Sequence, residues 1–290
     1  MESLKGQTAF ITGASMGIGE AIAVALAEQG VNLALVSRSK DKLETVRTNI
    51  TSKFPKVKVG VYPLDLQHQA DVEKAVKAAI SEIGQIDILI NNVSILSLCL
   101  WYEARSMGSL LTTLQAGLAL GAPGRFWEIP ADQITQMSGT NINGVMYTTH
   151  AILNHSMWER KKGTIINISS VTGLECPPFN GEAVYHASKA FLEGFTNSLR
   201  METAGSDIRV LVLRPGCVVT HFHLQRVQYD QGAMDEFFQG YDPLVAEDLA
   251  QSVLYMLSLP SRISIKALDC VPTAQRALTR FDREWKSRHE

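Results

Sequence analysis

The sequence predicts an α/β protein whose parallel sheet is covered on both faces by helices. Short apolar segments rich in β-branched residues alternate with longer segments whose apolar residues recur at helical spacing. The short segments are apolar along nearly their whole length, which is typical of strands buried on both faces. A glycine-rich turn follows the first of them. Together these observations favour a doubly wound sheet flanked by helices on both faces.

The apolar segments predict six strands in chain order. The first strand is expected over residues 8–12, and the helical spacing that follows over 19–29 ends at Gly30. Further strands are expected over residues 31–36, 57–62, 86–90, 164–168 and 208–213, and further helices from residue 40 and over 70–83. No internal repeat or low-complexity linker is evident, so we expect one domain over residues 1–290.

The composition argues against several kinds of partner. Of the 290 residues, 46% are hydrophobic and 19% are charged, and the formal net charge is −2 with the basic residues scattered. We therefore expect neither nucleic acid nor an anionic membrane as a partner. No segment reaches the roughly 20 consecutive apolar residues of a membrane-spanning helix, and the N-terminus lacks the apolar core of a signal peptide. A cytoplasmic protein is expected.

The cysteines predict neither a metal site nor a disulfide. Cys99, Cys176, Cys217 and Cys270 are far apart, with no C-x-x-C motif and no histidine at ligand spacing. We expect buried, reduced thiols and no metal.

The turn after the first strand has the sequence of a dinucleotide-binding loop. Residues 12–19 read Thr-Gly-Ala-Ser-Met-Gly-Ile-Gly. Glycines allow a close approach of the backbone to a pyrophosphate, and the following helix presents free N–H groups and its positive dipole end. Because the turn lies between a strand and a helix, it predicts a Rossmann fold. The residues expected to contact the cofactor here are Gly13, Ser15, Gly17, Ile18 and Gly19.

The end of the second strand favours NADP(H) over NAD(H). An enzyme that prefers NAD usually places a carboxylate here, which binds the 2′-hydroxyl of the ribose. This sequence has Arg38 instead, and its next acidic residue is Asp41. An arginine pairs well with a 2′-phosphate. The alternative is that Arg38 is an ordinary solvated side chain.

Tyr185 and Lys189 form a candidate acid–base pair. They are four residues apart on a predicted helix, so both side chains lie on the same face. A tyrosine with a pKa near its usual value of about 10 is a poor catalyst at neutral pH. A neighbouring ammonium group stabilises the phenolate and lowers this pKa.

With these motifs the sequence resembles the short-chain dehydrogenase/reductase family over nearly its whole length. The matching motifs in chain order are the turn at 12–19, Leu64-Asp65-Leu66, Asn91-Asn92, Asn141-Ile142-Asn143-Gly144, the segment 169–173, Tyr185 with Lys189, and the segment 215–220. The resemblance implies an NADP(H)-dependent oxidoreductase that acts on the alcohol or carbonyl group of a small molecule. It also implies a homodimer or homotetramer, with interface helices that follow Asn143 and contain Tyr185.

The resemblance further implies a catalytic role for four residues. Tyr185 would be the general acid that protonates the carbonyl oxygen, and Lys189 would bind the nicotinamide ribose and lower the pKa of Tyr185. Ser170 would donate a hydrogen bond to the same carbonyl oxygen. Ser170 is preferred to Ser169 because it begins the family pattern Ser-x-x-Gly. Asn143 would hold a water molecule that relays protons to Lys189.

The remaining matches imply contacts with the cofactor. Asp65 would bind the adenine amine, and Asn92 would line the adenosine side. The loop after the sixth strand would hold the carboxamide through Val218 and Thr220. The cofactor contacts implied for this loop are Pro215, Gly216, Val218 and Thr220. Taken alone, Asp65 is also consistent with a turn residue, and Asn143 with a polar core residue.

The sequence departs from the family pattern after the fourth strand. The family has Asn-Asn-Ala-Gly there, whereas this chain has Asn91-Asn92-Val93-Ser94. Residues 116–123 read Ala-Gly-Leu-Ala-Leu-Gly-Ala-Pro and resemble the missing continuation. Removal of residues 93–115 would join the two parts and restore the motif.

We hypothesise that residues 93–115 translate a retained short intron, as found in fungal genes. Val93-Ser94 can be encoded by GTA-AGT, which resembles a splice donor, and Gln115 by CAG, which resembles an acceptor. Leu111-Thr112 can encode CTAAC, which resembles a branch point. The alternative is a true loop insertion, which surface loops tolerate at small cost. Transcripts that always contain these codons would rule out the intron. If the segment is translated, it is expected to impair cofactor binding.

Weaker similarities point to one branch of the family, the NADP-dependent 3-hydroxy acid (serine-type) dehydrogenases. They lie in residues 116–121, 243–249 and 271–275. They imply a small hydroxy acid and its keto form as substrates. One alternative is a fungal-type biosynthetic reductase of a larger ketone, which residues 217–241 would cover. Another is a non-catalytic NADP-binding protein, against which the intact catalytic residues argue.

Overall fold

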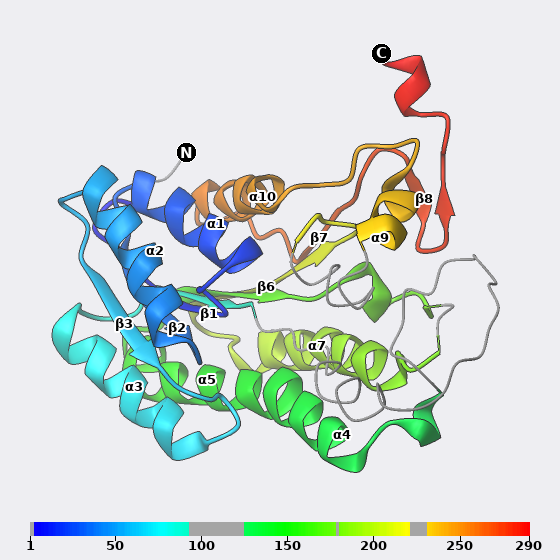
Figure 1. Cartoon of the computed structure of the whole chain (residues 1–290). Coiled ribbons are helices and arrows are strands. Elements are labelled where there is room, and N and C mark those ends of the chain that lie inside the picture. The colour runs from blue at the N-terminus through cyan, green and yellow to red at the C-terminus, as the bar shows by residue number, and fades with distance from the viewer. Residues whose placement is uncertain (1–2, 93–124, 178–179, 221–230) are drawn as a thin grey trace.

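A seven-stranded parallel sheet lies at the centre of the protein (Figure 1). The computed structural model describes residues 3–92, 125–177, 180–220 and 231–290, apart from the side chains at 231, 233 and 234. The strand order is β3-β2-β1-β4-β5-β6-β7, and each neighbouring pair is parallel. The chain therefore winds outward in both directions from β1 and β4, which confirms the predicted doubly wound fold.

The six predicted strands are present, with ends that differ by up to two residues. The strands are β1 (Thr8–Thr12), β2 (Asn32–Ser37), β3 (Val59–Pro63), β4 (Ile88–Asn91), β5 (Lys162–Ile168), β6 (Asp207–Pro215) and β7 (Ala267–Cys270). The edge strand β7 was not predicted. It has only four residues, includes Asp269, and is half exposed, so it lacks the continuous apolar pattern of a central strand.

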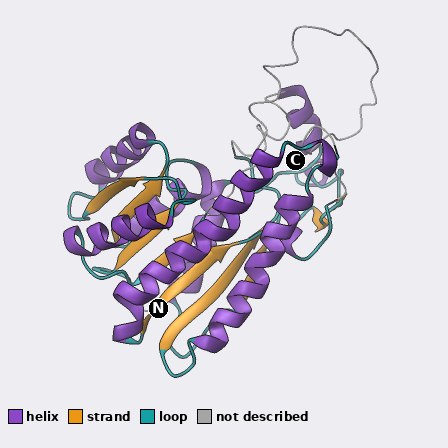
Figure 2. Cartoon of the chain, turned by 90° about the horizontal axis from the view of Figure 1, so that it is seen from below, coloured by secondary structure: helices purple, strands orange, loops and turns teal. Residues whose placement is uncertain are grey.

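Two layers of helices cover the two faces of the sheet (Figure 2). The helices are α1 (Gly17–Glu28), α2 (Lys40–Lys53), α3 (Gln69–Glu82), α4 (Ala131–Ser138), α5 (Gly144–Ile152), α6 (Trp158–Arg160), α7 (Ala183–Glu202), α9 (Gln231–Phe238) and α10 (Ala246–Ser258). Side chains of α1, α2 and α10 share one core cluster with the sheet. Side chains of α3, α5 and α7 share the other.

The strands are apolar on both faces because each face has its own core. In β1, Ile11 belongs to the cluster beneath α1, α2 and α10, whereas its neighbour Phe10 belongs to the cluster beneath α3, α5 and α7. Both side chains are fully buried. Successive residues of a strand point to opposite faces, so a sheet between two helical layers needs apolar residues at every position.

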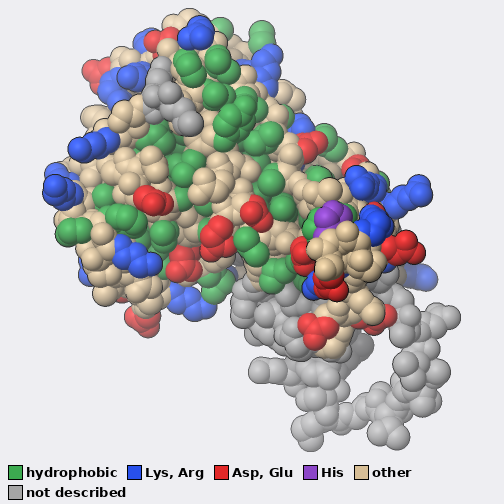
Figure 3. All heavy atoms as spheres, turned by 90° about the horizontal axis from the view of Figure 1, so that it is seen from above, with side chains coloured by type: hydrophobic (Ala, Val, Ile, Leu, Met, Phe, Trp, Pro, Cys, Tyr) green, Lys and Arg blue, Asp and Glu red, His purple; other side chains and the backbone are tan. Residues whose placement is uncertain are grey.

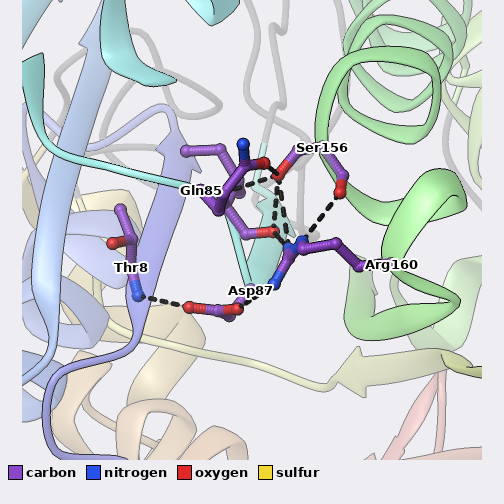
Figure 4. Close-up of polar contacts among 6 residues, drawn as sticks. Thr8, Gln85, Asp87, Ser156 and Arg160 are labelled. Carbon is purple, nitrogen blue, oxygen red and sulfur yellow. Dashed lines mark hydrogen bonds and ion pairs between the residues drawn. The ribbon is translucent and has the colours of Figure 1, made fainter. Parts of the chain in front are cut away.

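A polar cluster anchors the amino ends of the central strands (Figure 4). The Arg160 guanidinium donates to Asp87 Oδ1 at 2.7 Å and to Ile86 O at 2.6 Å. Asp87 Oδ2 accepts from Thr8 N at 3.0 Å, at the start of β1. Ser156 Oγ accepts from Ile86 N at 2.7 Å. These bonds join the starts of β1 and β4 to the end of the helical segment that precedes β5.

Several predictions concern residues outside the described ranges. The proposed intron product, residues 93–115, and the family-like segment 116–123 both lie there. So do residues 221–230 of the segment predicted to cover the substrate.

Within the described residues, each helix is too short or too polar to cross a membrane. On the face shown in Figure 3, Lys and Arg side chains are spread around the rim rather than gathered into one patch.

Candidate active site

The turn between β1 and α1 is closely packed at Gly13 and Gly19, where only glycine fits. Gly13 has a φ of +63°, and a Cβ atom built there would lie 2.2 Å from Asn92 O. At Gly19 a Cβ would lie 2.2 Å from Gly13 O. Asn92 also donates from its backbone N to Thr12 Oγ1 at 3.0 Å. Side chains at these glycines would therefore displace the turn from the end of β4.

The first turn of α1 follows the glycine-rich turn directly and presents backbone N–H groups there. The helix begins at Gly17, and in the described structure its N-cap residue, Met16, makes no side-chain cap hydrogen bond. The first N–H groups of a helix have no partner within the helix, and they bind anions together with the helix dipole. The turn and the helix therefore fit the pyrophosphate of a dinucleotide. Ser15 and Ile18 are half-buried beside it.

The predicted adenosine-side residues follow the neighbouring strands. Arg38 comes directly after β2 and is exposed. Asp65 follows β3, is half-buried, and accepts from Gln67 N at 3.0 Å and from Gln67 Nε2 at 3.1 Å. Because β3, β2 and β1 are adjacent, these residues and the glycine-rich turn lie along the same carboxyl edge of the sheet.

The loop after β6 comes back to the same turn. Thr220 Cβ would lie 3.8 Å from a Cβ atom at Gly17, so the loop and the start of α1 face each other. Pro215 ends β6, and Gly216 N donates to Cys270 O at 2.8 Å. Val218 is buried and forms a parallel bridge with Leu244. The predicted contacts in this loop therefore lie across the sheet edge from Gly17.

Tyr185 and Lys189 lie on one face of α7 and are both buried. Their exposed fractions are 5% and 2%. Lys189 Nζ donates to Ile168 O, at the end of β5, at 2.9 Å and lies 5.7 Å from the centre of the Tyr185 ring. Burial lowers the pKa of Lys189 to about 8, although the Glu193 carboxylate opposes this shift. An ammonium group that is buried beside a phenol favours loss of the phenolic proton.

The short helical turn η4 (Val171–Gly173) brings Ser170 to α7. Ser170 is its N-cap residue, is half-buried, and accepts from Thr172 N at 3.2 Å. The carbonyl of Thr172 contacts His186 Nδ1 of α7. The neighbouring Ser169 is buried and donates to Lys189 O at 3.4 Å, so its hydroxyl is engaged with the helix backbone.

Asn143 ends a π-helical turn, η2 (Gly139–Asn143), between α4 and α5, and is half-buried. Asn141 in the same turn donates to Ser188 Oγ at 3.4 Å, and Ser188 Oγ donates to Tyr185 O at 2.7 Å. The turn is therefore tied to α7 beside the Tyr185 backbone. Single π-helical turns inside longer helices often occur at functional sites.

Sequence reasoning missed a buried chain of amides and hydroxyls beneath this site. Asn91 Nδ2 donates to Asn167 Oδ1 at 2.8 Å and to Thr149 Oγ1 at 3.0 Å. Asn167 Nδ2 donates to Thr196 Oγ1 at 2.7 Å. The chain joins α5, β4, β5 and α7. Its sequence signal is an asparagine near the end of each of two strands, beside buried isoleucine and leucine residues.

A second feature that the sequence did not reveal is a cluster of charged side chains formed by Glu193, Arg214 and Asp269. Glu193, one turn further along α7, accepts from Arg214 Nε at 3.1 Å and from Arg214 Nη2 at 2.9 Å. Arg214 Nη1 donates to Asp269 Oδ1 at 3.0 Å. The cluster thereby connects α7 with β6 and the edge strand β7.

The cysteines differ in part from the prediction. Cys176, Cys217 and Cys270 are free thiols. Cys217 is buried as expected, whereas Cys270 is half-buried and Cys176, in the loop after η4, is exposed. Cys99 lies outside the described residues. Within the described ranges, no three His, Cys, Asp or Glu side chains gather as metal ligands would.

Comparison with known proteins agrees with this architecture. The family model of the short chain dehydrogenases matches residues 7–230. A sulfoacetaldehyde reductase of Chromohalobacter salexigens is 32% identical over 266 residues, which cover 92% of this chain and 94% of that protein. An NADP-dependent 3-hydroxy acid dehydrogenase of Schizosaccharomyces pombe is 31% identical over 278 residues, covering 95% and 96%. The closed form of a serine dehydrogenase complexed with NADP⁺ superimposes with a TM-score of 0.76 at 29% identity, covering 93% and 96%.

A parallel doubly wound sheet with a glycine-rich first turn is the architecture of a dinucleotide-binding Rossmann domain. The chain belongs to the short-chain dehydrogenase/reductase family.

Proposed function

We propose that this protein interconverts a secondary alcohol and a ketone with NADP(H), and that its substrates are small 3-hydroxy acids and their keto forms. The observation that carries the proposed chemistry is the buried Lys189 ammonium group, which lies 5.7 Å from the centre of the Tyr185 ring and donates to Ile168 O at the end of β5. The substrate class is supported by the names of relatives, an NADP-dependent 3-hydroxy acid dehydrogenase and a serine 3-dehydrogenase. Burial of a lysine costs free energy because its charge must be desolvated. A lysine that is buried in spite of this cost, beside another titratable group, is more common at functional sites than in purely structural helices. A homodimer or homotetramer is proposed from family membership, and sedimentation would measure it.

The chain's own residues fit an NADP(H) cofactor, which supplies or accepts the hydride when bound. The glycine turn and the start of α1 would hold the pyrophosphate, and Arg38 would pair with the 2′-phosphate. The NADP named for the S. pombe relative and for the serine dehydrogenase complex supports this choice. The proposed cofactor contacts are Gly13, Ser15, Gly17, Ile18, Gly19, Arg38, Asp65, Asn92, Tyr185, Lys189, Pro215, Gly216, Val218 and Thr220.

The proposed chemistry is acid–base catalysis by Tyr185. In the reductive direction its hydroxyl donates a proton to the carbonyl oxygen, and Lys189 stabilises the phenolate that remains. Ser170 donates a hydrogen bond to the same oxygen as charge develops on it. Asn143 would position water for return of the proton through Lys189. The supporting geometry is that η4, η2 and α7 are held together by hydrogen bonds.

A substrate panel tests the proposed function. NADPH formation would be measured with NADP⁺ and 3-hydroxybutyrate, and NADPH consumption with its keto form, acetoacetate, and with a bulky cyclic ketone. In the reductive direction acetoacetate should have a kcat/KM about tenfold or more above that of the bulky ketone, which corresponds to about 1.4 kcal/mol of transition-state discrimination. The reverse order would favour the alternative of a biosynthetic ketone reductase.

Replacement of Arg38 tests the cofactor preference. Arg38→Ala should weaken NADPH binding about tenfold or more while NADH binding stays the same, because the charge-assisted bonds involve only the 2′-phosphate. Fluorescence titration measures both constants. Lys53→Ala, an exposed lysine at the other end of α2, is the charge-matched control. An equal loss for both cofactors would exclude a 2′-phosphate contact.

Replacement of the two adjacent serines tests the assignment of Ser170. Ser170→Ala should lower kcat about 100-fold, as expected when a donor to a developing oxyanion is lost. Ser169→Ala should lower it less than about tenfold, because that hydroxyl bonds to the Lys189 carbonyl and contributes only about 1 kcal/mol. Steady-state kinetics with saturating NADPH measures both. If Ser169→Ala has the larger effect, the assignment is wrong.

A further inference from the structure

We propose that the C-terminal segment 274–286, here called the C-terminal clamp, positions the segments that surround the substrate, with Gln275 and Arg283 as its positioning residues. The clamp contains the antiparallel strands β8 (Gln275–Ala277) and β9 (Arg280–Phe281). It lies outside the parallel sheet, beside α9 (Figure 1). The proposal rests on the function proposed above, since that function defines which segments surround the substrate.

Gln275 holds the loop after β6. Its side chain is 6% exposed, and its Oε1 accepts from Cys217 N at 3.0 Å. The approach is possible because residue 216 is glycine, since a Cβ atom there would lie 2.3 Å from Gln275 Oε1. The same loop continues to Val218 and Thr220, which are proposed to contact the nicotinamide end of the cofactor. The amide of Gln275 therefore fixes the start of this loop.

Arg283 holds the carboxyl end of α9. Its Nη1 donates to Phe237 O at 2.5 Å and to Gln239 O at 3.0 Å. These are main-chain carbonyls at the end of the helix, where a cation also opposes the negative end of the helix dipole. The next residue, Gly240, has a φ of +83°, and a Cβ atom there would lie 1.9 Å from Arg283 O. The backbone of the clamp is therefore pressed directly against the end of α9.

Three aromatic rings lie within cation–π distance of the Arg283 guanidinium, while Arg283 as a whole is exposed. Its central carbon lies 6.0 Å from the ring centre of Phe237, 5.3 Å from that of Tyr241 and 5.5 Å from that of Phe281. Tyr241 of the α9 side and Phe281 of the clamp are stacked, with 4.9 Å between their centres. A guanidinium at these distances makes cation–π contacts with rings of both the α9 side and the clamp. Arg283 therefore joins the clamp to α9 by polar and by aromatic contacts.

The clamp also reaches the loop that follows the Ser170 turn. Leu278 N, at the tip between β8 and β9, donates to Glu175 Oε2 at 2.9 Å. Glu175 itself donates its backbone N to Val171 O of η4 at 3.1 Å. The clamp thus contacts the three segments expected to border the reacting groups: the loop after Ser170, the loop after β6, and α9. It makes these contacts without taking part in the cofactor turn between β1 and α1.

Arg283→Met tests the clamp, with Arg280→Met as its control. The first variant removes the donors to α9, and the second makes the same charge change at an exposed position of β9. For Arg283→Met we expect faster amide hydrogen exchange over 235–241 and a substrate KM raised about tenfold, the size expected when two hydrogen bonds from a charged donor are lost. NADPH affinity should stay within about twofold of wild type, because α1 is not involved. Arg280→Met should behave like the wild type.

Gln275→Met provides a milder second variant in case Arg283→Met does not fold. It leaves only Cys217 N unpaired, so faster exchange at 216–220 and a KM raised about fivefold are expected. Wild-type exchange in a folded Arg283→Met or Gln275→Met protein would overturn the proposal. Faster exchange with an unchanged KM would reduce the clamp to a structural support and would also overturn it. If the wild type turns over none of the panel substrates, the proposed function fails, whereas the exchange data still decide whether the clamp holds α9.

Discussion

Tyr185→Phe is expected to lower kcat about 1,000-fold while the dissociation constant of NADPH changes less than about twofold. Phenylalanine keeps the ring, which is 95% buried against α7 and its surroundings, and removes only the hydroxyl that we propose as the proton donor. General acid catalysis contributes about 10² to 10⁴ in rate, so its loss should dominate kcat. Stopped-flow kinetics and fluorescence titration of NADPH measure the two quantities.

Tyr255→Phe is the matched control for this experiment. Tyr255 lies on α10, is 53% exposed, and undergoes the same chemical change far from the proposed site. Its kcat should equal that of the wild type. Turnover of Tyr185→Phe at nearly the wild-type rate would exclude Tyr185 as the acid and would direct attention to another donor.

Lys189→Met is expected to lower kcat about 100-fold or more and to remove a pH dependence of stability. The pKa of Lys189 is about 8 in the folded protein, below its ordinary value of 10.5, because the side chain is buried. At pH values between these two pKa values, the unfolded chain binds up to one proton more than the folded chain. The free energy of unfolding of the wild type should therefore rise with pH across this window, relative to Lys189→Met.

The expected size of this difference follows from the two pKa values. Between pH 7 and pH 10 the wild type should gain roughly 2 kcal/mol relative to Lys189→Met. Urea unfolding of both proteins at several pH values measures this gain. Groups other than Lys189 titrate in both proteins, so their contribution cancels when the two free energies of unfolding are subtracted. Lys56→Met, at an exposed lysine, should follow the wild type at every pH. A constant difference between wild type and Lys189→Met would show that Lys189 has an ordinary pKa.

The elements that the sequence predicted well are those encoded by neighbouring residues. The turn at Gly13 to Gly19 is signalled by three glycines between a strand and a helix, and the structure has this turn in the predicted place. Tyr185 and Lys189 are placed on one face of α7 by their spacing alone. Such patterns depend on local geometry, which a single sequence displays directly.

The elements that the sequence did not predict depend on contacts between distant residues. Gln275 is bonded to a residue 58 positions earlier, and Arg283 to one 46 positions earlier. Nothing in the local sequence of the clamp distinguishes these two side chains from its exposed polar residues. The spacing of apolar residues also does not reveal the π-helical turn that ends at Asn143, because one extra residue in a single turn changes this spacing very little.

The hydrogen bonds of Arg160 and Asp87 hold the central strands together independently of the segments that are proposed to bind substrate and cofactor. They secure the amino ends of the strands, whereas the turn after β1, Ser170 after β5 and the loop after β6 lie at the carboxyl ends. Changes in those loops therefore leave the hydrogen bonds that align β1, β4 and β5 intact. Substitutions in the loops can therefore change substrate preference without weakening the hydrogen bonds that stabilise the sheet. Stability and specificity are free to evolve as separate traits.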